Sequence, residues 1–365
     1  MTDPGAAALA SRILPVMLFL ASITVVAEIA QIAGVFDVAG HWAARHARRR
    51  TMLLWLLVVA ISCASTIVLS LDTTAVLLTP VVLAIARQIK VSPLPFALTT
   101  VWLANTASLL LPVSNLTNLL ALHHFSRLGG YPAYLRVAWL LALVSVAVTV
   151  VIIAVLHRRE LRGRFTIDPP DEPHDRLLLR VSAGVCILIG PAFLTGVTPA
   201  IPATVAAVIL LGTLWIRRRV DLRRVQVPWQ MIIAVCVVFV VIDVLGRHGL
   251  TTAMQHVAGT GHSPVDLLRL SATGAVGANV VNNLPAYLAI EPATGFGAVR
   301  LMALLIGTNA GPLVAVWGSL ATLLWRDRCR RAGVRIPLGR FTAESALVAV
   351  CAVTLASLAL GLSAP

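Results

Sequence analysis

Residues 105–120, NTASLLLPVSNLTNLL, match residues 309–324, NAGPLVAVWGSLATLL, without a gap. Asn105 falls on Asn309, and the leucines near the end of the first stretch fall on leucines of the second. Both stretches are apolar runs interrupted by polar residues, Pro or Gly, which is typical of a transmembrane helix broken at membrane depth. A match of this length within one chain indicates an internal repeat.

The match continues in the same order toward the start of each copy. The polar centre of residues 52–90 aligns with that of residues 264–296, which places Asp72 on Asn283. Earlier still, Glu28 falls on Asp243. Each correspondence is weak alone, but their shared order supports two copies of one unit.

The composition is that of a lipid-embedded protein. Of the 365 residues, 58% are hydrophobic and only 12% are charged, which is too apolar for the surface of a soluble domain. The net charge of +14 comes from arginine clusters between apolar runs, without a basic groove carrying aromatic platforms, so we expect no nucleic-acid partner. Such clusters mark cytoplasmic loops. They predict a multi-pass inner-membrane protein with both termini outside.

Two segments are predicted to enter and leave the bilayer on the same side. Residues 52–90 have basic residues at both ends and polar residues at the centre, which predicts a hairpin that enters from the cytoplasm. Residues 264–296 have uncharged flanks and carry Asn282 and Asn283 centrally, which predicts a hairpin from outside. With this topology the two copies run in opposite directions across the membrane, as in many secondary transporters.

The predicted fold is therefore an all-α polytopic membrane protein with two inverted repeats, each containing a re-entrant helical hairpin and an interrupted transmembrane helix. The N-terminal half is residues 1–156, with its hairpin at 52–90 and its broken helix at 97–123. A cytoplasmic linker follows at 157–176. The C-terminal half is residues 177–365, with its hairpin at 264–296 and its broken helix at 298–325.

The candidate binding residues are the polar side chains at these interruptions, since broken helices offer half-helix N-termini, free carbonyls and polar side chains to a small solute or ion. They are Asp72, Thr73, Thr74, Asn105, Ser114, Asn115, Asn118, Asn282, Asn283, Asn309, Ser319 and Thr322. The alternative is that these residues serve helix packing.

Asp72 is the first candidate for proton coupling, because a carboxyl group at membrane depth is costly and is often functional. Glu28 and Asp243, which lie within apolar runs, are the next candidates, with helix packing as their alternative. The five cysteines are scattered without a CxxC pair, so we expect reduced thiols and no metal site, with a thiolate site for a soft metalloid as the alternative. No catalytic motif is found, and neither an enzyme nor a cofactor is predicted.

These motifs resemble those of the ArsB-type arsenite and antimonite permeases, a branch of the ion transporter superfamily with a fold like that of divalent-anion symporters. Residues 71–75, LDTTA, are similar to the family's Asn-Asp-x-x-Ala, and the motif at 105–118 is similar to its Asp-Thr-Ala-Ser to Ser-Asn-Leu-x-Asn. Residues 282–285, NNLP, and the motif at 307–325 resemble its Asn-Asn-x-Pro and Gly-x-Asp/Asn-x-Gly-Pro to Gly-Ser-Leu-Ala-Thr-Leu-Leu-Trp. The resemblance runs from about Ile13 to the C-terminus.

The resemblance implies proton-driven efflux of arsenite or antimonite, sometimes aided by a soluble ATPase, and a homodimer. It also implies that the family's upstream N-terminal helices are lacking here. Leu71, Asn105, Asn309 and residues 315–317 depart from the family by replacing polar or ionisable groups.

Two other kinds of carrier in the superfamily remain open, namely a dicarboxylate or citrate symporter and a sodium/proton antiporter. The interruptions contain no Lys or Arg, which favours a neutral trihydroxide such as arsenous acid over a multiply charged anion. The expected partners are thus a small inorganic solute or anion, a coupling proton or sodium ion, and the lipid bilayer. A non-transporting receptor or scaffold would not need polar interruptions in symmetric positions.

Overall fold

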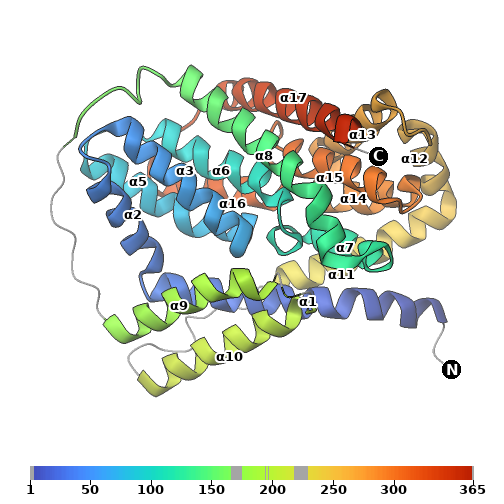
Figure 1. Cartoon of the computed structure of the whole chain (residues 1–365), viewed down its shortest axis with the longest axis horizontal. Coiled ribbons are helices and arrows are strands. Elements are labelled where there is room, and N and C mark those ends of the chain that lie inside the picture. Colours follow the sequence, from blue (N-terminus) through green and yellow to red (C-terminus); the bar gives the residue numbers. More distant parts are fainter. Residues whose placement is uncertain (1–3, 166–174, 194, 196, 218–228, 364–365) are drawn as a thin grey trace. The chain divides into compact units, whose positions relative to one another are not determined.

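The computed structural model describes a helical protein without a β-strand in the ranges 4–165, 175–193, 195, 197–217 and 229–363 (Figure 1). Seven helices in these ranges are long and apolar enough to cross a membrane, and a bent pair formed by Cys236–Ile242 and Gly246–Ala258 raises the number to eight. The predicted all-α polytopic class is confirmed. Residues 166–174 of the predicted linker lie outside the described residues. So do the arginines at 218, 219, 223 and 224, which follow Arg217 in one of the basic clusters.

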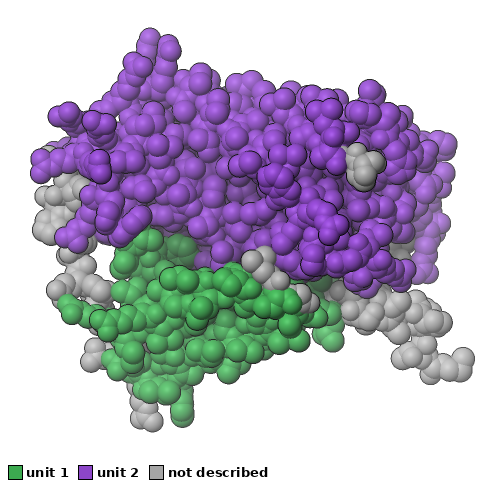
Figure 2. Space-filling model, viewed as in Figure 1, with its two compact units in different colours: residues 1–39, 169–238 green, residues 40–168, 239–365 purple. Residues whose placement is uncertain are grey.

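The chain divides into two compact units, residues 1–39 with 169–238 and residues 40–168 with 239–365 (Figure 2). Helices of the first unit are α1 (Pro4–Ile32), α9 (Arg176–Phe193), α10 (Ala200–Arg217) and the first part of α11 (Trp229–Leu245). α1 packs against α9 and α10, where Ser22 Oγ lies 3.0 Å from Thr204 Oγ1 and the Phe19 and Phe193 rings meet edge to face. Small polar contacts between apolar helices are typical of membrane packing.

The second unit contains two sets of elements in the same order: a helix pair divided by a short break, an interrupted helix, and a long helix. In the first set these are α3 (Thr51–Val68), α4 (Leu71–Thr73), a π-helix η1 (Thr74–Leu78), α5 (Thr79–Gln88), α6 (Leu94–Thr106), α7 (Leu116–Phe125) and α8 (Gly130–Leu156). In the second they are α13 (Pro264–Val281), α14 (Asn283–Ile290), α15 (Ala298–Ala310), α16 (Leu320–Arg331) and α17 (Leu338–Ser363). The unit also holds α2 (Val35–His46), which begins in the first unit, and α12 (Thr251–Ala258).

The ends of the second helix pair are held together by one buried arginine. The Arg300 guanidinium donates hydrogen bonds to the backbone oxygens of Gly259 and Gly261 before α13, and to that of Ala293 after α14. Both ends of residues 264–296 therefore lie side by side, which supports the predicted re-entrant hairpin.

Two of the basic clusters also lie side by side. The backbone amide of Thr51 donates to Gly163 O at 3.1 Å, and that of Phe165 donates to Arg49 O at 3.1 Å. The arginines around position 49 and those preceding Phe165 are therefore neighbours, which supports their assignment to one face of the membrane. The inversion of the two halves stays a prediction.

Glycines allow α13 and α15 to pack at close range. A methyl group at Gly307 would overlap the backbone oxygen of Ser271, and one at Gly311 would overlap Ala275. Ser271 Oγ also donates to Ala303 O at 2.7 Å across the same interface. The spacing is the small-xxx-small pattern of membrane helix pairs.

Gly307→Ala is expected to destabilise the protein by about 3 kcal/mol, because the added methyl group meets backbone that cannot move aside without separating the helices. Thermal unfolding in detergent measures the loss. Gly212→Ala in α10 is the control, since nothing lies within 4 Å of its added methyl group. Equal melting temperatures for the two variants would contradict the close packing described here.

Candidate functional site

Each break in the second unit ends at the capped N-terminus of a new helical segment. Ser70 Oγ accepts a hydrogen bond from the Thr73 amide at 3.2 Å, and Ser319 Oγ accepts one from the Thr322 amide at 3.2 Å. The side-chain oxygens of Asn115 and Asn282 accept in the same way from amides two residues ahead, at 3.3 and 3.4 Å. Ser and Asn are preferred caps, and capped N-termini carry partial positive charge.

Asn282 carries the only one of these caps with a left-handed backbone, with φ of 92°. With ψ of 154°, this is a conformation that residues with a side chain rarely adopt, and it marks the break between α13 and α14. Its side-chain Nδ2 donates to Trp317 O at 2.9 Å. The neighbouring Asn283 amide donates to Gly318 O, also at 2.9 Å.

Hydrogen bonds join the two interrupted helices to each other, to α3 of the first hairpin and to the tip of the second hairpin. Ser114 Oγ donates to Ile67 O at the end of α3, at 2.8 Å. Next to it, Asn115 Nδ2 donates to Asn309 Oδ1 at 2.7 Å, which joins the two interrupted helices. The bonds from Asn282 and Asn283 then join the second interruption to its hairpin. The predicted clusters, far apart in sequence, thus lie in one connected region.

Asn309 is the centre of this region and is fully buried. Its Oδ1 accepts from Ser108 Oγ and Asn115 Nδ2, each at 2.7 Å. Its Nδ2 donates to Asn118 Oδ1 and to Leu305 O, each at 2.8 Å. Asn118 Nδ2 in turn donates a hydrogen bond to Ser108 O at 2.7 Å. All hydrogen-bonding capacity of Asn309 is therefore used within the protein.

Asn105, which aligns with Asn309, has different surroundings. Its Nδ2 donates to Val101 O at 2.9 Å, as Asn309 does to Leu305 O. Its Oδ1, however, is buried without a hydrogen-bond partner in the described part of the chain. Asn309 Oδ1 receives its hydrogen bonds from Ser108 and Asn115. In the other copy, Ser108 is replaced by Pro312, which has no side-chain donor. Asn115 is replaced by Ser319, whose hydroxyl lies 2.9 Å from Thr322 Oγ1.

At the first hairpin tip, two threonines are hydrogen-bonded within the protein, whereas one oxygen of Asp72 is not. Thr74 is fully buried and donates to Ser65 Oγ at 2.9 Å, and Thr73 Oγ1 lies 2.9 Å from Ser70 Oγ. Both threonines therefore stabilise the tip. Asp72 Oδ1 is buried and has no hydrogen-bond partner among the residues that the structure describes. Of the twelve predicted site residues, Asp72 and Asn105 are the two with an unpartnered buried acceptor in those ranges.

The other two coupling candidates belong to α1 and α11. Glu28 is a half-buried residue of α1 in the first unit. Asp243 belongs to α11, and its side chain lies outside the described part of the structure.

Comparison with known proteins gives the region its context. The sequence profile of CitMHS, described as citrate transporters, matches residues 2–307. This chain belongs to the CitMHS family. It is 28% identical over 354 residues to the arsenical pump membrane protein of Yersinia enterocolitica, covering 88% of this chain and 81% of that protein. An uncharacterised transporter of Mycobacterium bovis is 22% identical over 370 residues, covering 95% and 85%.

A solved structure shares the fold. The YdaH transporter of Alcanivorax borkumensis superposes with a TM-score of 0.59 and 13% identity, covering 99% of this chain and 89% of that one. The predicted membership of the ArsB-type branch of the ion transporter superfamily is confirmed. This member of the CitMHS family is a multi-pass inner-membrane transporter.

In this CitMHS-family transporter, Asn279 belongs to the same hydrogen-bonded region, although the sequence did not single it out. Its Nδ2 donates to Gly311 O, and its Oδ1 accepts from the Ala315 amide, both at 2.8 Å. Trp317 Nε1 donates to Asn279 O at 2.8 Å. Asn279 thus holds the second interruption against α13. The available signal was an amide side chain in an apolar run, one turn before Asn282 and Asn283.

A second missed group joins α7 to the end of the second hairpin. Glu291 is buried, and its Oε1 lies 3.0 Å from His124 Nε2 and accepts from Tyr287 OH at 2.7 Å. The His124 ring also stacks on Phe296 with ring centroids 4.3 Å apart. The structure therefore gives His124 a specific partner on another element.

Proposed function

We propose that this chain is a secondary active transporter that carries arsenite or antimonite out across the inner membrane in exchange for protons. The observation that supports this substrate is the pair of unpartnered acceptors, Asp72 Oδ1 and Asn105 Oδ1. They lie on neighbouring elements, because α4 packs against α6. Undissociated arsenous acid carries three O–H donors, which these acceptors can receive.

The electrostatics of the region point the same way. The predicted site residues include no Lys or Arg, so the only positive ends that could face an anion there are half-helix N-termini. A buried anion without a cationic partner is costly, whereas a neutral trihydroxide has no such penalty. Relatives named as arsenical pumps, at 28% identity, support the same substrate class.

A citrate or dicarboxylate carrier is the second candidate, favoured by the description of the matching family. Capped N-termini at Ser70, Asn115, Asn282 and Ser319 are the groups that would receive its carboxylates. A sodium/proton antiporter is the third, since unpartnered carbonyl and carboxylate oxygens also suit a sodium ion. Two further partners belong to the proposal through the family resemblance, a second copy of the chain and a soluble ATPase.

Flux into everted membrane vesicles under an imposed pH gradient tests the proposal. Arsenite, antimonite, citrate and sodium are offered separately, and vesicles without the protein give the background. We expect uptake of arsenite and antimonite to rise above background only with the gradient in the efflux direction. Gradient-driven movement of citrate without arsenite or antimonite would favour the citrate carrier instead. Gradient-driven movement of sodium alone would favour the sodium/proton antiporter.

The orientation is tested by labelling from the external medium. Arg164 and His256 are both exposed, and the topology places Arg164 in the cytoplasm and His256 outside. In right-side-out cells an impermeant maleimide is expected to label His256→Cys and to spare Arg164→Cys, with wild-type labelling subtracted. Equal labelling of the two would remove the basis for inverted repeats. Arg218, which the topology also places inside, lies outside the described residues.

A further inference from the structure

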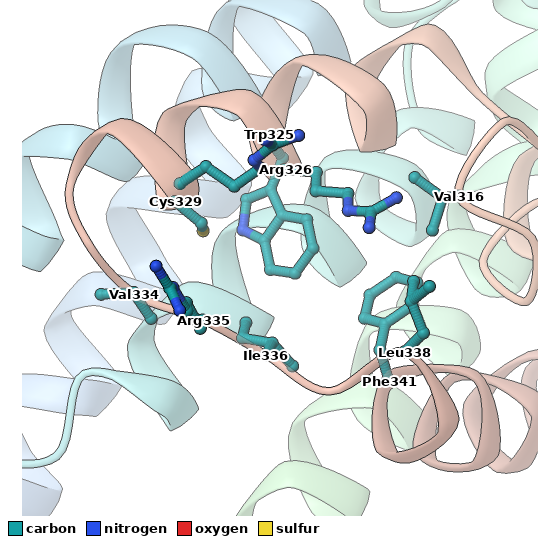
Figure 3. Close-up of a pocket in the computed structure, with 10 residues that line it drawn as sticks. Val316, Trp325, Arg326, Cys329, Val334, Arg335, Ile336, Leu338 and Phe341 are labelled. Carbon is teal, nitrogen blue, oxygen red and sulfur yellow. The ribbon is translucent and has the colours of Figure 1, made fainter.

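A cavity of about 450 Å³ lies between the second half of α16, the segment that follows it and the start of α17 (Figure 3). Figure 3 shows the Trp325 indole in the middle of the lining side chains, with Val334, Arg335 and Ile336 along the connecting segment. Its size falls in the range of small-ligand sites, roughly 300–1,000 Å³. The cavity belongs to one unit and is lined by none of the predicted site residues.

Three arginines line the cavity without acidic partners. Arg326, Arg330 and Arg335 form no ion pair with any residue that the structure describes. Neighbouring arginines differ, since Arg331 pairs with Asp327 at 2.7 Å and Arg340 with Glu344 at 2.7 Å. The positive charge of the cavity is therefore uncompensated, and it attracts an anion.

Another part of the lining is apolar and aromatic. The Trp325 and Phe341 rings stack with centroids 5.2 Å apart, and Trp325 Nε1 donates to Ala97 O at 2.8 Å, which fixes the indole. Ile336 and Leu338 complete this wall. Burial raises the pKa of the Cys329 thiol to about 12, so it stays neutral and does not provide a thiolate for a soft metal.

The cavity also lies where the chain changes from apolar to basic. α16 begins with the apolar residues 320–325 and ends with four arginines between positions 326 and 331, and the membrane-spanning α17 starts at Leu338. A change of this kind marks the level of the lipid headgroups. Basic pockets between helices at that level suit anionic headgroups, while an apolar wall suits the adjoining acyl chain.

We propose that this cavity binds the phosphate headgroup of an anionic phospholipid of the inner membrane. Arg326, Arg330 and Arg335 bind the phosphodiester, and the wall formed by Ile336, Leu338 and Phe341 contacts the start of an acyl chain. Val316, which belongs to the second interruption, also lines the cavity. A bound lipid therefore contacts the same segment that Asn279 holds, and stabilises it.

Native mass spectrometry of the purified full-length protein tests the site. Phosphatidylglycerol and phosphatidylcholine with identical chains are titrated separately, and the ratio of their affinities is measured. The pocket variant is Arg330→Gln with Arg335→Gln. The control is Arg328→Gln with Arg331→Gln, which removes the same charge from the same region without altering the cavity lining.

We expect wild type and control to prefer phosphatidylglycerol about tenfold or more, and the pocket variant to lose that preference, because it lacks two charge-assisted hydrogen bonds. All four arginines are at the surface or half-buried, so thermal unfolding should confirm that each variant folds. If the control and the pocket variant lose the preference for phosphatidylglycerol equally, the preference depends on net charge alone and not on the cavity. That result would overturn the proposal.

A second comparison distinguishes a lipid from a free anion. Leu338→Asn alters the apolar wall and leaves the arginines intact, so it should weaken phosphatidylglycerol binding without changing the binding of inorganic phosphate. Displacement of the lipid by an equal concentration of inorganic phosphate would show a small-anion site, and tight association with an acidic protein but not with lipid would show a protein interface. Either result overturns the lipid assignment.

Discussion

Asn309→Leu is expected to abolish transport and to lower the free energy of unfolding by on the order of 2–5 kcal/mol. Leucine fills a similar volume but removes four hydrogen bonds, three of them to side chains of the other interrupted helix. Asn115 Nδ2 and Asn118 Oδ1 then lose their Asn309 partner in a buried region, and each such loss costs about 1–3 kcal/mol. The single hydroxyl proton of Ser108 is shared between Asn309 Oδ1 and Asn105 O, so Ser108 keeps Asn105 O as its acceptor.

Asn105→Leu is the matched control, since Asn105 aligns with Asn309 and makes only the bond from Nδ2 to its own helix. Its unfolding free energy should fall by about 1 kcal/mol or less. Chemical unfolding in detergent, followed through tryptophan fluorescence, compares the two variants. Equal destabilisation by both would mean that the bonds between the interrupted helices contribute little.

The sequence predicted the places where helices break better than the contacts that the breaks make. Polar residues at 72–74, 105–118 and 282–285 interrupt apolar runs, and helix ends fall beside or within all three. This works because the bilayer restricts unsatisfied backbone to few places. The predicted grouping of the clusters rested on the internal repeat, which relates distant segments without giving any distance between them.

The contacts of Asn279 show what the sequence could not provide. Three of its hydrogen-bond partners lie more than 30 positions away: the backbone oxygen of Gly311, the backbone amide of Ala315 and the indole of Trp317. Residues 315–317 depart from the family's turn by replacing polar side chains. Because their backbone groups make several of the contacts, the change of side chains leaves these contacts in place.

The pairing of Asn105 with Asn309 shows a second limit. Identical residues at aligned positions suggested equivalent roles, yet one is fully bonded and the other has an open acceptor. The difference comes from the neighbours of each residue, since Ser108 is replaced by Pro312 in the second copy. Repeat symmetry therefore predicts positions, while the local donors decide which position keeps an unpartnered acceptor.

Asp72→Asn is expected to eliminate pH-driven flux while leaving the protein folded. Asp72 Oδ1 is buried and unpartnered within the described ranges, so an ionised carboxylate there is costly until a proton, cation or solute donor reaches it. Asparagine has nearly the same size and cannot take up a proton. Flux under an imposed pH gradient should fall to the background of empty vesicles, and exchange of substrate at equal pH should continue.

Glu28→Gln and Asp243→Asn are the controls, because these residues belong to α1 and α11 and each change removes one titrating group. They should reduce pH-driven flux only slightly. Full pH-driven flux in the Asp72 variant, with a loss in either control, would move the coupling site to that control. Asn105 and Asn309 cannot titrate, so no second carboxyl group among the predicted binding residues is available to replace Asp72. The coupling proton and the solute would then compete for the same open oxygen, and this competition is what obliges an exchanger to release one before it binds the other.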